Sequence, residues 1–295
     1  MKILIGCLNV NGLGGSEMYH YELSRELKLL GNEVVLFSMR DIDYFDQVRI
    51  KLRELGIIQV DTRTLNPEEQ FDIMVLSQPE VNVYMLNTLK DTPCISIIHS
   101  EIRSEDPILS PRISHYITIR DSIRKLLIEE FKIDQSRVSL IYNPIDKSRF
   151  NPIGAKKHDK TTGIFVGGAL DSIRFKAVCH LAEHCIENDW DLKIMSDGVY
   201  DFDHPNISYI NSRWDTEHLV KNCDFTAGIL MGRTTLEGWC CGVPGYMYQI
   251  NKSGDILSIE TEAPKDILTL CDSRYVAQQH VDLYKRVIEQ HENNL

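Results

Sequence analysis

The start of the chain alternates short apolar runs with longer amphipathic segments, and this alternation limits what the chain can fold into. The apolar run Lys2–Leu8 precedes a glycine-rich turn at Asn11–Glu17. A helical pattern then continues to Leu30, and Glu33–Ser38 is again apolar and β-branched. This order predicts a strand, a helix and a second parallel strand, which is the repeating unit of a parallel sheet covered by helices.

The alternation is interrupted once, in the middle of the chain. The stretch Asn151–Thr162 is polar and has no periodic pattern, as linkers do, and strands and helices alternate again after it. With 295 residues the chain is long enough for two domains, each with its own core. We therefore predict one α/β domain over residues 1–155, a second over 156–272, and a terminal helix over 273–295. Six residues give this helix an apolar stripe that should pack on another element: Tyr275, Val276, Val281, Leu283, Tyr284 and Val287.

Composition excludes several classes of function. The net charge is −11, so we expect no stable binding to nucleic acid, whose phosphates attract clustered Lys and Arg. The eight cysteines have no paired spacing, and the N-terminus begins directly with a core strand, which predicts a reduced, cytoplasmic protein. No apolar run approaches the roughly 20 residues that span a bilayer, so any membrane contact should be peripheral.

The glycine turn after the first strand matches neither of two common phosphate-binding motifs. A dinucleotide fingerprint needs a third glycine where Glu17 stands, and a Walker loop needs a Lys-Ser or Lys-Thr pair that is missing behind these glycines. Gly14 and Gly15 remain at a helix start, where exposed backbone N–H groups favour an anion. The alternative is a tight turn in which Ser16 caps the helix.

Six further segments, in this order and spacing, resemble those of a known family. They are Ile98-His99 at a strand end, Tyr116–Leu126, Val138–Asp146 followed by Phe150–Pro152, Gly163–Gly168, Arg233–Pro244 and the terminal Val281–Ile288. Together with the glycine pair and the helix exit Leu30–Val34, they are similar to the GT-B glycosyltransferases of group 1, or family 4, which retain the sugar configuration.

This resemblance implies two Rossmann-like α/β domains that face each other across a cleft, with the C-terminal helix crossing back to the first domain. It places the acceptor side in the first domain and the nucleotide-sugar side in the second. The activity it implies is metal-independent transfer of a sugar, without a cofactor, from a nucleoside diphosphate sugar as co-substrate. The acceptor stays open among a glycan, a lipid-linked sugar, a protein and a modified base.

The resemblance also implies the site residues. The catalytic set is His99, Arg174 and Lys176, and the donor-binding set is Gly14, Gly15, Gly168, Arg233, Thr234, Thr235 and Glu237. His99 is expected to hydrogen-bond the sugar, and Glu237 to accept hydrogen bonds from the ribose. The basic residues and the helix starts are expected to compensate the charge that develops on the diphosphate. Arg233 either contacts the diphosphate or pairs with a nearby acid.

Two departures from the family pattern leave alternatives open. The family's first acid, eight residues before Glu237, is replaced by Ile229, and its Gly-Arg pair is Gly167-Gly168. A homologue that binds a nucleotide sugar or a protein without turnover is therefore a second hypothesis. A third is a zinc hydrolase, because His180-Leu-Ala-Glu183-His184 matches a zinc-protease pattern. Our expectation from the resemblance is that no metal is bound.

Overall fold

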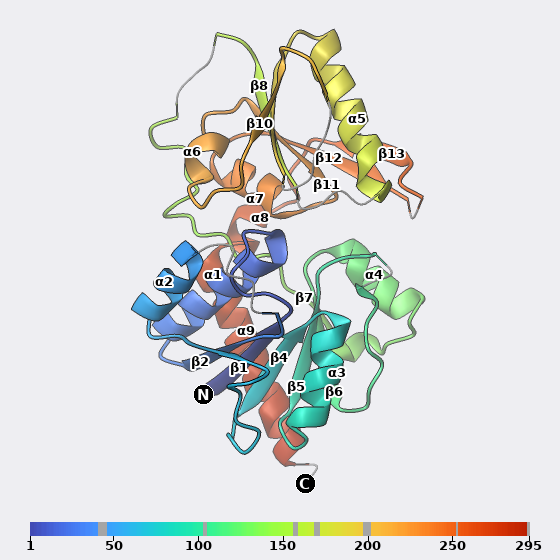
Figure 1. Ribbon diagram of the computed structural model, residues 1–295. Coiled ribbons are helices and arrows are strands. Elements are labelled where there is room, and N and C mark those ends of the chain that lie inside the picture. The colour runs from blue at the N-terminus through green and yellow to red at the C-terminus, as the bar shows by residue number, and fades with distance from the viewer. Residues whose placement is uncertain are drawn as a thin grey trace. The chain divides into compact units, whose positions relative to one another are not determined.

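The computed structural model contains two compact units, each with its own β-sheet (Figure 1). The first comprises Met1–Gly12, Ser16–Pro144 and Ser273–Leu295, and the second comprises Leu13–Gly15 and Ile145–Asp272. The structure describes residues 1–40, 46–102, 105–155, 159–167, 172–196, 202–251 and 253–293. In this division the C-terminal segment Ser273–Leu295 is part of the first unit. The predicted facing of the two domains across a cleft stays a prediction.

The first unit alternates strands and helices as the sequence predicts. Its elements are β1 (Lys2–Cys7), α1 (Gly15–Leu29), β2 (Glu33–Ser38), α2 (Asp46–Glu54), β3 (Ile58–Asp61), β4 (Ile73–Ser77), α3 (Pro79–Thr88), β5 (Cys94–Ile98), β6 (Ile113–Thr118), α4 (Asp121–Glu129), the 3-10 helix η2 (Gln135–Arg137), β7 (Val138–Leu140) and α9 (Ser273–Glu292).

The seven strands of the first unit form one parallel sheet in the order β3-β2-β1-β4-β5-β6-β7. Every residue of β4 and β5 is buried, because helices cover both faces of such a sheet. The strand order reverses between β1 and β4. The strands that follow β1 in the sequence are added on one side of it, and those that follow β4 are added on the other side. Ligands of open α/β sheets bind at such a reversal, outside the carboxyl ends of the strands.

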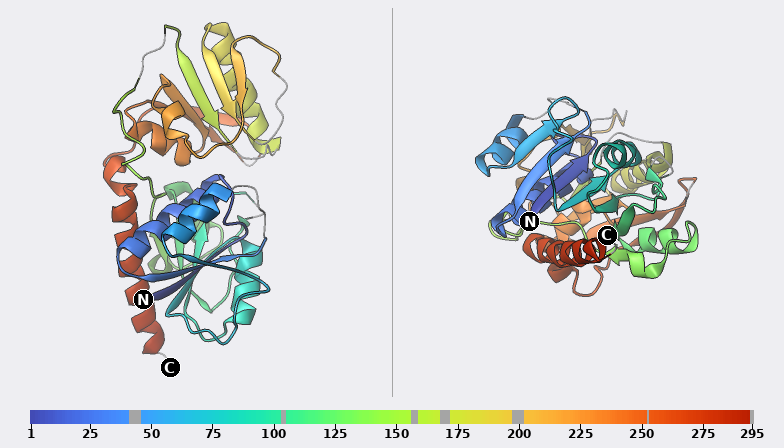
Figure 2. Two further views of the ribbon diagram at one scale, coloured as in Figure 1. Left: turned by 60° about the vertical axis from the view of Figure 1, so that its left-hand side comes forward. Right: turned by 90° about the horizontal axis from the view of Figure 1, so that it is seen from below.

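The C-terminal helix α9 completes the first unit and packs beside α1 (Figure 2). The hydroxyl of Tyr19 on α1 lies 2.8 Å from His280 Nε2, and the hydroxyl of Ser273 donates to Glu26 at 3.2 Å. Five of the six residues predicted to form the apolar stripe are buried. Tyr275 is the exception, with 41% of its surface exposed, so the prediction was wrong for this residue.

The second unit repeats the same architecture on a smaller scale. Its elements are β8 (Thr162–Val166), α5 (Ser172–Glu187), β9 (Asp191–Met195), β10 (Ile207–Ile210), α6 (Glu217–Val220), β11 (Phe225–Ile229), α7 (Arg233–Cys240), β12 (Gly245–Ile250), β13 (Ile256–Glu260) and α8 (Ile267–Leu270). The sheet order is β10-β9-β8-β11-β12-β13, in which only the last pairing is antiparallel. The order reverses between β8 and β11, which gives this unit its own reversal point.

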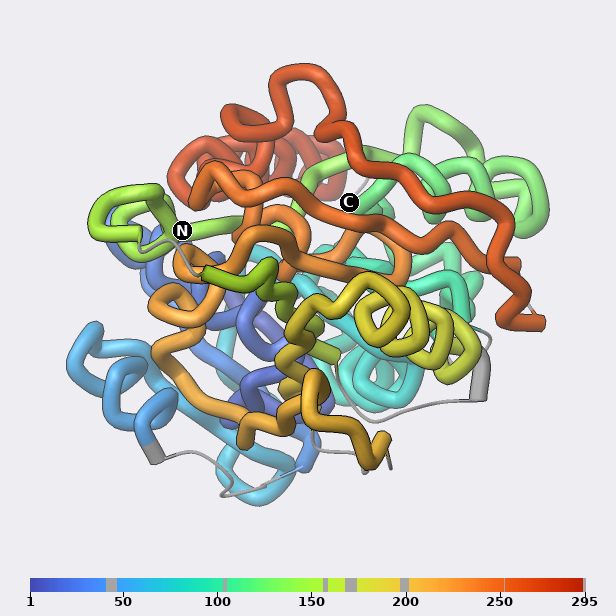
Figure 3. The backbone as a smooth tube through the Cα atoms, turned by 90° about the horizontal axis from the view of Figure 1, so that it is seen from above, coloured from blue at the N-terminus to red at the C-terminus, as the bar shows by residue number. Residues whose placement is uncertain are grey.

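Two helices fix the core of the second unit. The helix α5 lies against β9 and β12 (Figure 3), and α7 lies against β11 and β12. Phe165, Leu181 and Phe225 are among the buried residues that fill the space beneath α5. The helix α7 approaches the sheet closely because glycines face it: a Cβ on Gly245 would lie 2.6 Å from the methyl group of Thr235.

Besides the short helices η2 and α8, two longer elements of the structure were not predicted from the sequence. The helix α3 begins at Pro79, whose fixed φ suits the first turn of a helix, but its valines and its low amphipathicity give no helical signal. The antiparallel strand β13 is mostly exposed along its length, so its sequence has no pattern of buried apolar residues that would predict a strand. Both elements depend on tertiary contacts, because α3 packs on β1 and β4, and β13 pairs with β12.

Replacing Gly163 with alanine should destabilise the second unit. Gly163 pairs with Phe225 on the neighbouring strand, and a Cβ at this position would lie 2.0 Å from the phenyl ring. The buried ring, packed edge-on against Tyr246, has little room to move, so we expect a loss of about 1–3 kcal/mol, typical of overpacking. Urea unfolding of the variant and the native protein measures this loss of stability. A double-mutant cycle with Phe225→Leu should show strong coupling, and simple additivity of the two changes would contradict this explanation.

Candidate active site

The glycine turn lies at the carboxyl end of β1, where α1 begins. Gly14 and Gly15 are exposed, Gly15 is the first residue of the helix, and a Cβ added to Gly15 would meet no atom within 4 Å. The Ser16 hydroxyl is bonded to the Glu17 carboxylate at 2.9 Å. The first backbone N–H groups of this fifteen-residue helix therefore lie beside exposed glycines. Unpaired N–H groups at a helix start are the arrangement that binds anions.

His99 follows the last residue of β5 and is linked to two side chains from other elements. Its Nε2 lies 3.0 Å from the hydroxyl of Ser77, which ends β4. The same hydroxyl lies 2.8 Å from Nε2 of His20 on α1, and His20 Nδ1 lies 2.5 Å from the carbonyl of Ser16. Side chains from α1, β4 and β5 thus form one hydrogen-bonded chain at the reversal point of the first sheet.

Burial keeps the histidines of this region neutral. Burial lowers the pKa of His20 to about 4, although its bond to the Ser16 carbonyl acts in the opposite direction. Burial, with the neighbouring His20 and Arg120, holds the pKa of His99 well below its ordinary value. The ring of Tyr19 packs edge-on against His99, with centroids 5.0 Å apart, and its hydroxyl reaches His280. Burial lowers the pKa of His280 to about 3.

A partly buried ion pair of Arg120 and Glu101 lies immediately beyond His99. Arg120, at the start of α4, donates from Nε to Glu101 Oε1 at 2.8 Å and from its terminal nitrogen to Oε2. Ser122 donates to the same carboxylate at 2.6 Å. Burial alone would raise the pKa of Glu101, but the hydrogen bonds and the positive charge of Arg120 outweigh it, and the pKa lies below its ordinary value. The positive charge of Arg120 is therefore balanced by a local acid.

In the second unit, the predicted ribose ligand Glu237 is buried and paired within its own helix. Arg233 Nε donates to Glu237 Oε1 at 3.1 Å, and the terminal nitrogen of Arg233 lies 3.0 Å from the same oxygen. Both residues are 7% exposed. Of the two roles left open for Arg233, the structure shows the pairing with a nearby acid.

The loop before α7 is strained at the reversal point of the second sheet. Leu230, directly after β11, has a φ of 61°, a conformation that residues with a branched side chain rarely adopt. Thr234, in the first turn of α7, donates its hydroxyl to the Val166 carbonyl at the end of β8 with a length of 3.3 Å. Thr235 is fully buried against the sheet. The start of α7 is thereby tied to the carboxyl end of β8.

The remaining predicted residues of the second unit lie along α5 or before it. Arg174 is half-buried in the first turns of the helix. Lys176 is 56% exposed, and its ammonium group pairs with Asp255 at 2.5 Å. Gly168 lies outside the residues that the structure describes. The structure therefore brings Arg233 and Glu237 together, and shows Lys176 engaged with an acid of the loop after β12.

The residues of the predicted zinc pattern lie on α5, and both histidines contact aromatic side chains of the same unit. His180 Nδ1 lies 3.3 Å from the Tyr248 hydroxyl, and the His184 ring packs edge-on against Trp190. Within the described ranges, no group of three or more His, Cys, Asp or Glu side chains is arranged to hold a metal ion. None of the helices in that part of the chain combines the length and the apolar character that crossing a bilayer requires.

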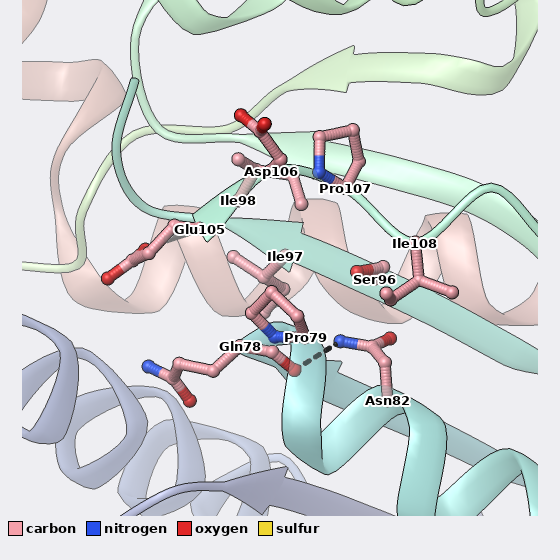
Figure 4. Close-up of a pocket in the computed structure, with 10 residues that line it drawn as sticks. All are labelled: Gln78, Pro79, Asn82, Ser96, Ile97, Ile98, Glu105, Asp106, Pro107 and Ile108. Carbon is pink, nitrogen blue, oxygen red and sulfur yellow. Dashed lines mark hydrogen bonds between the residues drawn. The ribbon is translucent and has the colours of Figure 1, made fainter. Parts of the chain in front are cut away.

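A small pocket lies beside β5. Figure 4 shows its lining, in which the amide nitrogen of Asn82 donates to the Gln78 carbonyl at 2.8 Å. Ser96 also lines the pocket, and parallel pairing sets Ile97 beside Ser77, so Ser96 points to the opposite face from Ser77. The residues that line the pocket include none of His20, Ser77 and His99.

Three residues of the candidate site were missed in the sequence: His20, Ser77 and Glu101. Ser77 carries the one usable signal, because it is a polar residue that ends a fully buried parallel strand. His20 stands on a helix face that gives no sign of its partners, and Glu101 stands in a loop.

Comparisons with known proteins agree with this architecture. Residues 13–149 match the family model described as Glycosyltransferase Family 4. No curated protein matches the sequence. A glycosyltransferase from Rickettsia africae ESF-5 has a similar structure, with a TM-score of 0.67, 13% identity, and coverage of 97% of this chain and 98% of that one.

Two further solved structures are similar over nearly their whole length. HepE of Anabaena, solved with UDP and glucose, has a TM-score of 0.63 and 12% identity, covering 100% of this chain and 99% of that one. AviGT4, a glycosyltransferase involved in avilamycin A biosynthesis, has a TM-score of 0.65 and 11% identity, covering 98% of both chains. The chain has the GT-B fold, and its residues 13–149, slightly less than half of its length, are similar to Glycosyltransferase Family 4.

Proposed function

We propose that the protein is a retaining glycosyltransferase that moves a sugar from a nucleoside diphosphate sugar to an acceptor. The observation that carries the proposal is the buried pair of Arg233 and Glu237 at the start of α7, next to the reversal point of the second sheet. A buried carboxylate needs hydrogen-bond donors, and in Rossmann-type sheets an acid near this edge accepts from ribose hydroxyls. HepE, which shares the fold, has been solved with UDP-glucose.

The reaction requires compensation for charge that develops on the leaving group. The bond between C1 of the sugar and the phosphate oxygen breaks, and its electron pair goes to the diphosphate. The acceptor oxygen forms the new bond to C1 from the same side, and its proton leaves with the diphosphate oxygen. In this scheme the guanidinium of Arg233, the amides at the start of α7 and those after Gly14 stabilise the diphosphate. No metal is needed in this scheme.

Each predicted catalytic residue has a defined task in the proposal. His99 in the first unit accepts a hydrogen bond from the transferred sugar. Arg174 and Lys176 on α5 approach the diphosphate, for which Lys176 must exchange its surface contact with Asp255 for the phosphate. An exposed ion pair of this kind is worth about 0–1 kcal/mol, so the exchange costs little. The acceptor is a hydroxyl of a glycan, a lipid-linked sugar, a protein or a modified base.

A second candidate function is nucleotide-sugar binding without turnover. It is favoured by one observation, that Ile229, the last residue of β11, occupies the position of the family's first acid. A partly buried isoleucine cannot accept hydrogen bonds from the sugar. The two functions make the same prediction for binding and opposite predictions for release of the nucleoside diphosphate.

Nucleoside diphosphates should stabilise the protein against heat. A ligand that binds only the folded state at 100 times its Kd adds about 2.7 kcal/mol of stability. We expect one of UDP, GDP and ADP to raise Tm by several degrees more than the matching monophosphate, because the second phosphate meets the helix starts. Thermal unfolding with each nucleotide measures this effect. Equal, negligible shifts with all of them would contradict donor binding.

Turnover is tested with the sugar conjugates of the nucleotide that stabilises the protein. Release of the nucleoside diphosphate, unchanged in EDTA, supports metal-independent transfer. Binding without release of nucleoside diphosphate from any conjugate supports the second candidate function. Loss of release in EDTA, restored by a divalent cation, would contradict metal independence.

A further inference from the structure

A series of hydrogen bonds runs from Ser16 through His20 and Ser77 to His99. The direction of each bond can be derived from the acceptor at the first end, the Ser16 carbonyl. The carbonyl of Ser16 can only accept, so His20 Nδ1, 2.5 Å away, carries the hydrogen of this bond. His20 is a neutral ring, because burial holds its pKa at about 4. Its other nitrogen, Nε2, is therefore an acceptor.

The next bond is then fixed in direction. His20 Nε2 lies 2.8 Å from the Ser77 hydroxyl, and as an acceptor it takes the single hydrogen of that hydroxyl. Ser77 has no second hydrogen to give, so in its 3.0 Å bond to His99 the serine oxygen accepts and His99 Nε2 donates. A neutral His99 that is protonated on Nε2 has a lone pair on Nδ1.

We infer that His20 and Ser77 are positioning residues that hold His99 in the tautomer with hydrogen on Nε2, so that Nδ1 is presented as an acceptor for a hydroxyl of the transferred sugar. The sugar contact rests on the proposed function, whereas the tautomer follows from the hydrogen bonds alone. Sugar hydroxyls can donate to this nitrogen, while a bare carbonyl group cannot. His99 thereby selects a ligand that presents a hydrogen-bond donor, such as a hydroxyl, at this position.

The surroundings of His99 support this assignment. The rings of Tyr19 and His20 pack edge-on against it, with centroids 5.0 and 5.4 Å away, and restrict rotation of the imidazole. A second proton on His99 would place a buried charge close to Arg120, which is among the groups that lower its pKa. The ring therefore stays neutral and keeps its lone pair through the physiological range of pH.

The chain also joins His99 to the glycine turn. The Ser16 carbonyl that fixes the first hydrogen belongs to the first turn of α1, directly after Gly15. The same short segment thus contributes N–H groups for an anion and, through His20, the orientation of the sugar ligand. In the proposed site, one helix start therefore binds the phosphate of the sugar donor and orients the histidine that contacts its sugar.

The tautomer can be read directly by NMR of the full chain labelled with 15N in histidine. Long-range 1H–15N correlation distinguishes a protonated ring nitrogen from a bare one, and the His99 signals are assigned from their loss in His99→Gln. We expect His99 with hydrogen on Nε2 and a bare Nδ1. A hydrogen on Nδ1 would overturn the inference, whatever the enzyme does with any donor.

Removing the serine hydroxyl tests its part in the chain. In Ser77→Ala we expect the His99 ring to shift toward a mixture of tautomers, and in Ser77→Thr, which keeps the hydroxyl, to return to the native form. The matched control is Ser96→Ala, because Ser96 is equally buried on the adjacent strand and its hydroxyl has no partner among the described residues. An unchanged His99 spectrum in a folded Ser77→Ala protein would contradict the role of Ser77.

Activity provides the second reading. Ser77→Ala should lower kcat/KM for the donor about tenfold, as expected for the loss of one hydrogen bond to the sugar, and leave the thermal shift by the free nucleoside diphosphate unchanged. Equal loss of both would mean that the substitution damages the site as a whole. If no donor is turned over at all, the proposed function fails, while the NMR result still decides the tautomer.

Discussion

Glu237→Gln is expected to remove most of the stabilisation that a nucleoside diphosphate gives to the protein. The carboxylate is buried in α7, and in the proposed site it accepts hydrogen bonds from the ribose. Hydrogen bonds to a charged group contribute about 1.5–3 kcal/mol, so binding should weaken about 10- to 100-fold. The measurements are nucleotide affinity by calorimetry and the nucleotide-dependent rise in Tm.

The same substitution also disturbs the protein itself, because Glu237 is the partner of Arg233. Removing one member of a buried ion pair costs about 3–5 kcal/mol, since the other charge stays buried. The double variant Arg233→Met with Glu237→Leu fills the space with apolar side chains and should recover much of this stability without recovering nucleotide binding. Stability and binding are thereby separated.

Glu183→Gln on α5 is the matched control, because this acid is exposed and lies in the same unit. It should leave both Tm and nucleotide affinity unchanged. Native affinity for the nucleotide in a folded Glu237→Gln protein would contradict the role of Glu237 in the proposed site.

The first unit should lose stability steeply as the pH falls below about 6.5. Burial lowers the pKa of His20 and His115 to about 4 and that of His280 to about 3, and it holds the pKa of His99 well below its ordinary value of 6.5. For His99 and His115, nearby positive groups act in the same direction. All four rings are therefore neutral in the folded protein at pH values where the unfolded chain binds protons.

The sign follows from the protons bound by each state. Below pH 6.5 the unfolded chain binds more protons than the folded one, so the free energy of unfolding falls as the pH falls toward 4. Each histidine contributes a slope of up to about 1.4 kcal/mol per pH unit, so four together reach about 5 kcal/mol per unit. Because domains are stable by only about 5–15 kcal/mol, we expect acid unfolding near pH 5.

Urea unfolding at pH 7.5, 6.5 and 5.5 measures this dependence. His280→Gln should reduce the slope by about one proton, or about 1.4 kcal/mol per pH unit. His218→Gln should leave the slope unchanged, because His218 is exposed and lies in the second unit. A free energy of unfolding that is constant between pH 7.5 and 5.5 would contradict the burial of these rings as neutral groups.

Much of the fold could be predicted because its signals are local. Strands such as β1 and β4 are continuous apolar runs, and their burial in the structure explains why. The apolar stripe of α9 follows from helical periodicity in the same way. The helix α3 and the strand β13 lack such signals and were missed.

The site could be predicted only in part. The sequence pointed to His99 and Glu237 as the polar residues of two family-like segments, and to Arg233 with two alternative roles. The pairing of Arg233 with Glu237 is between residues four apart on one helix, which is a separation that allows contact. That the pair lies at the reversal point could not be predicted, because this position depends on the strand order of the sheet.

By itself, the sequence determined the alternation of strands and helices, the division into two α/β domains and the similarity of the first half to a known family, because each depends on neighbouring residues or on local periodicity. Only the tertiary structure decided that His20, Ser77 and His99 form one chain. They are separated by 57 and 22 residues, and they meet because the strand order reverses between β1 and β4 and brings α1 beside the ends of β4 and β5. Contacts of this kind arise from packing between distant segments, which no local pattern records.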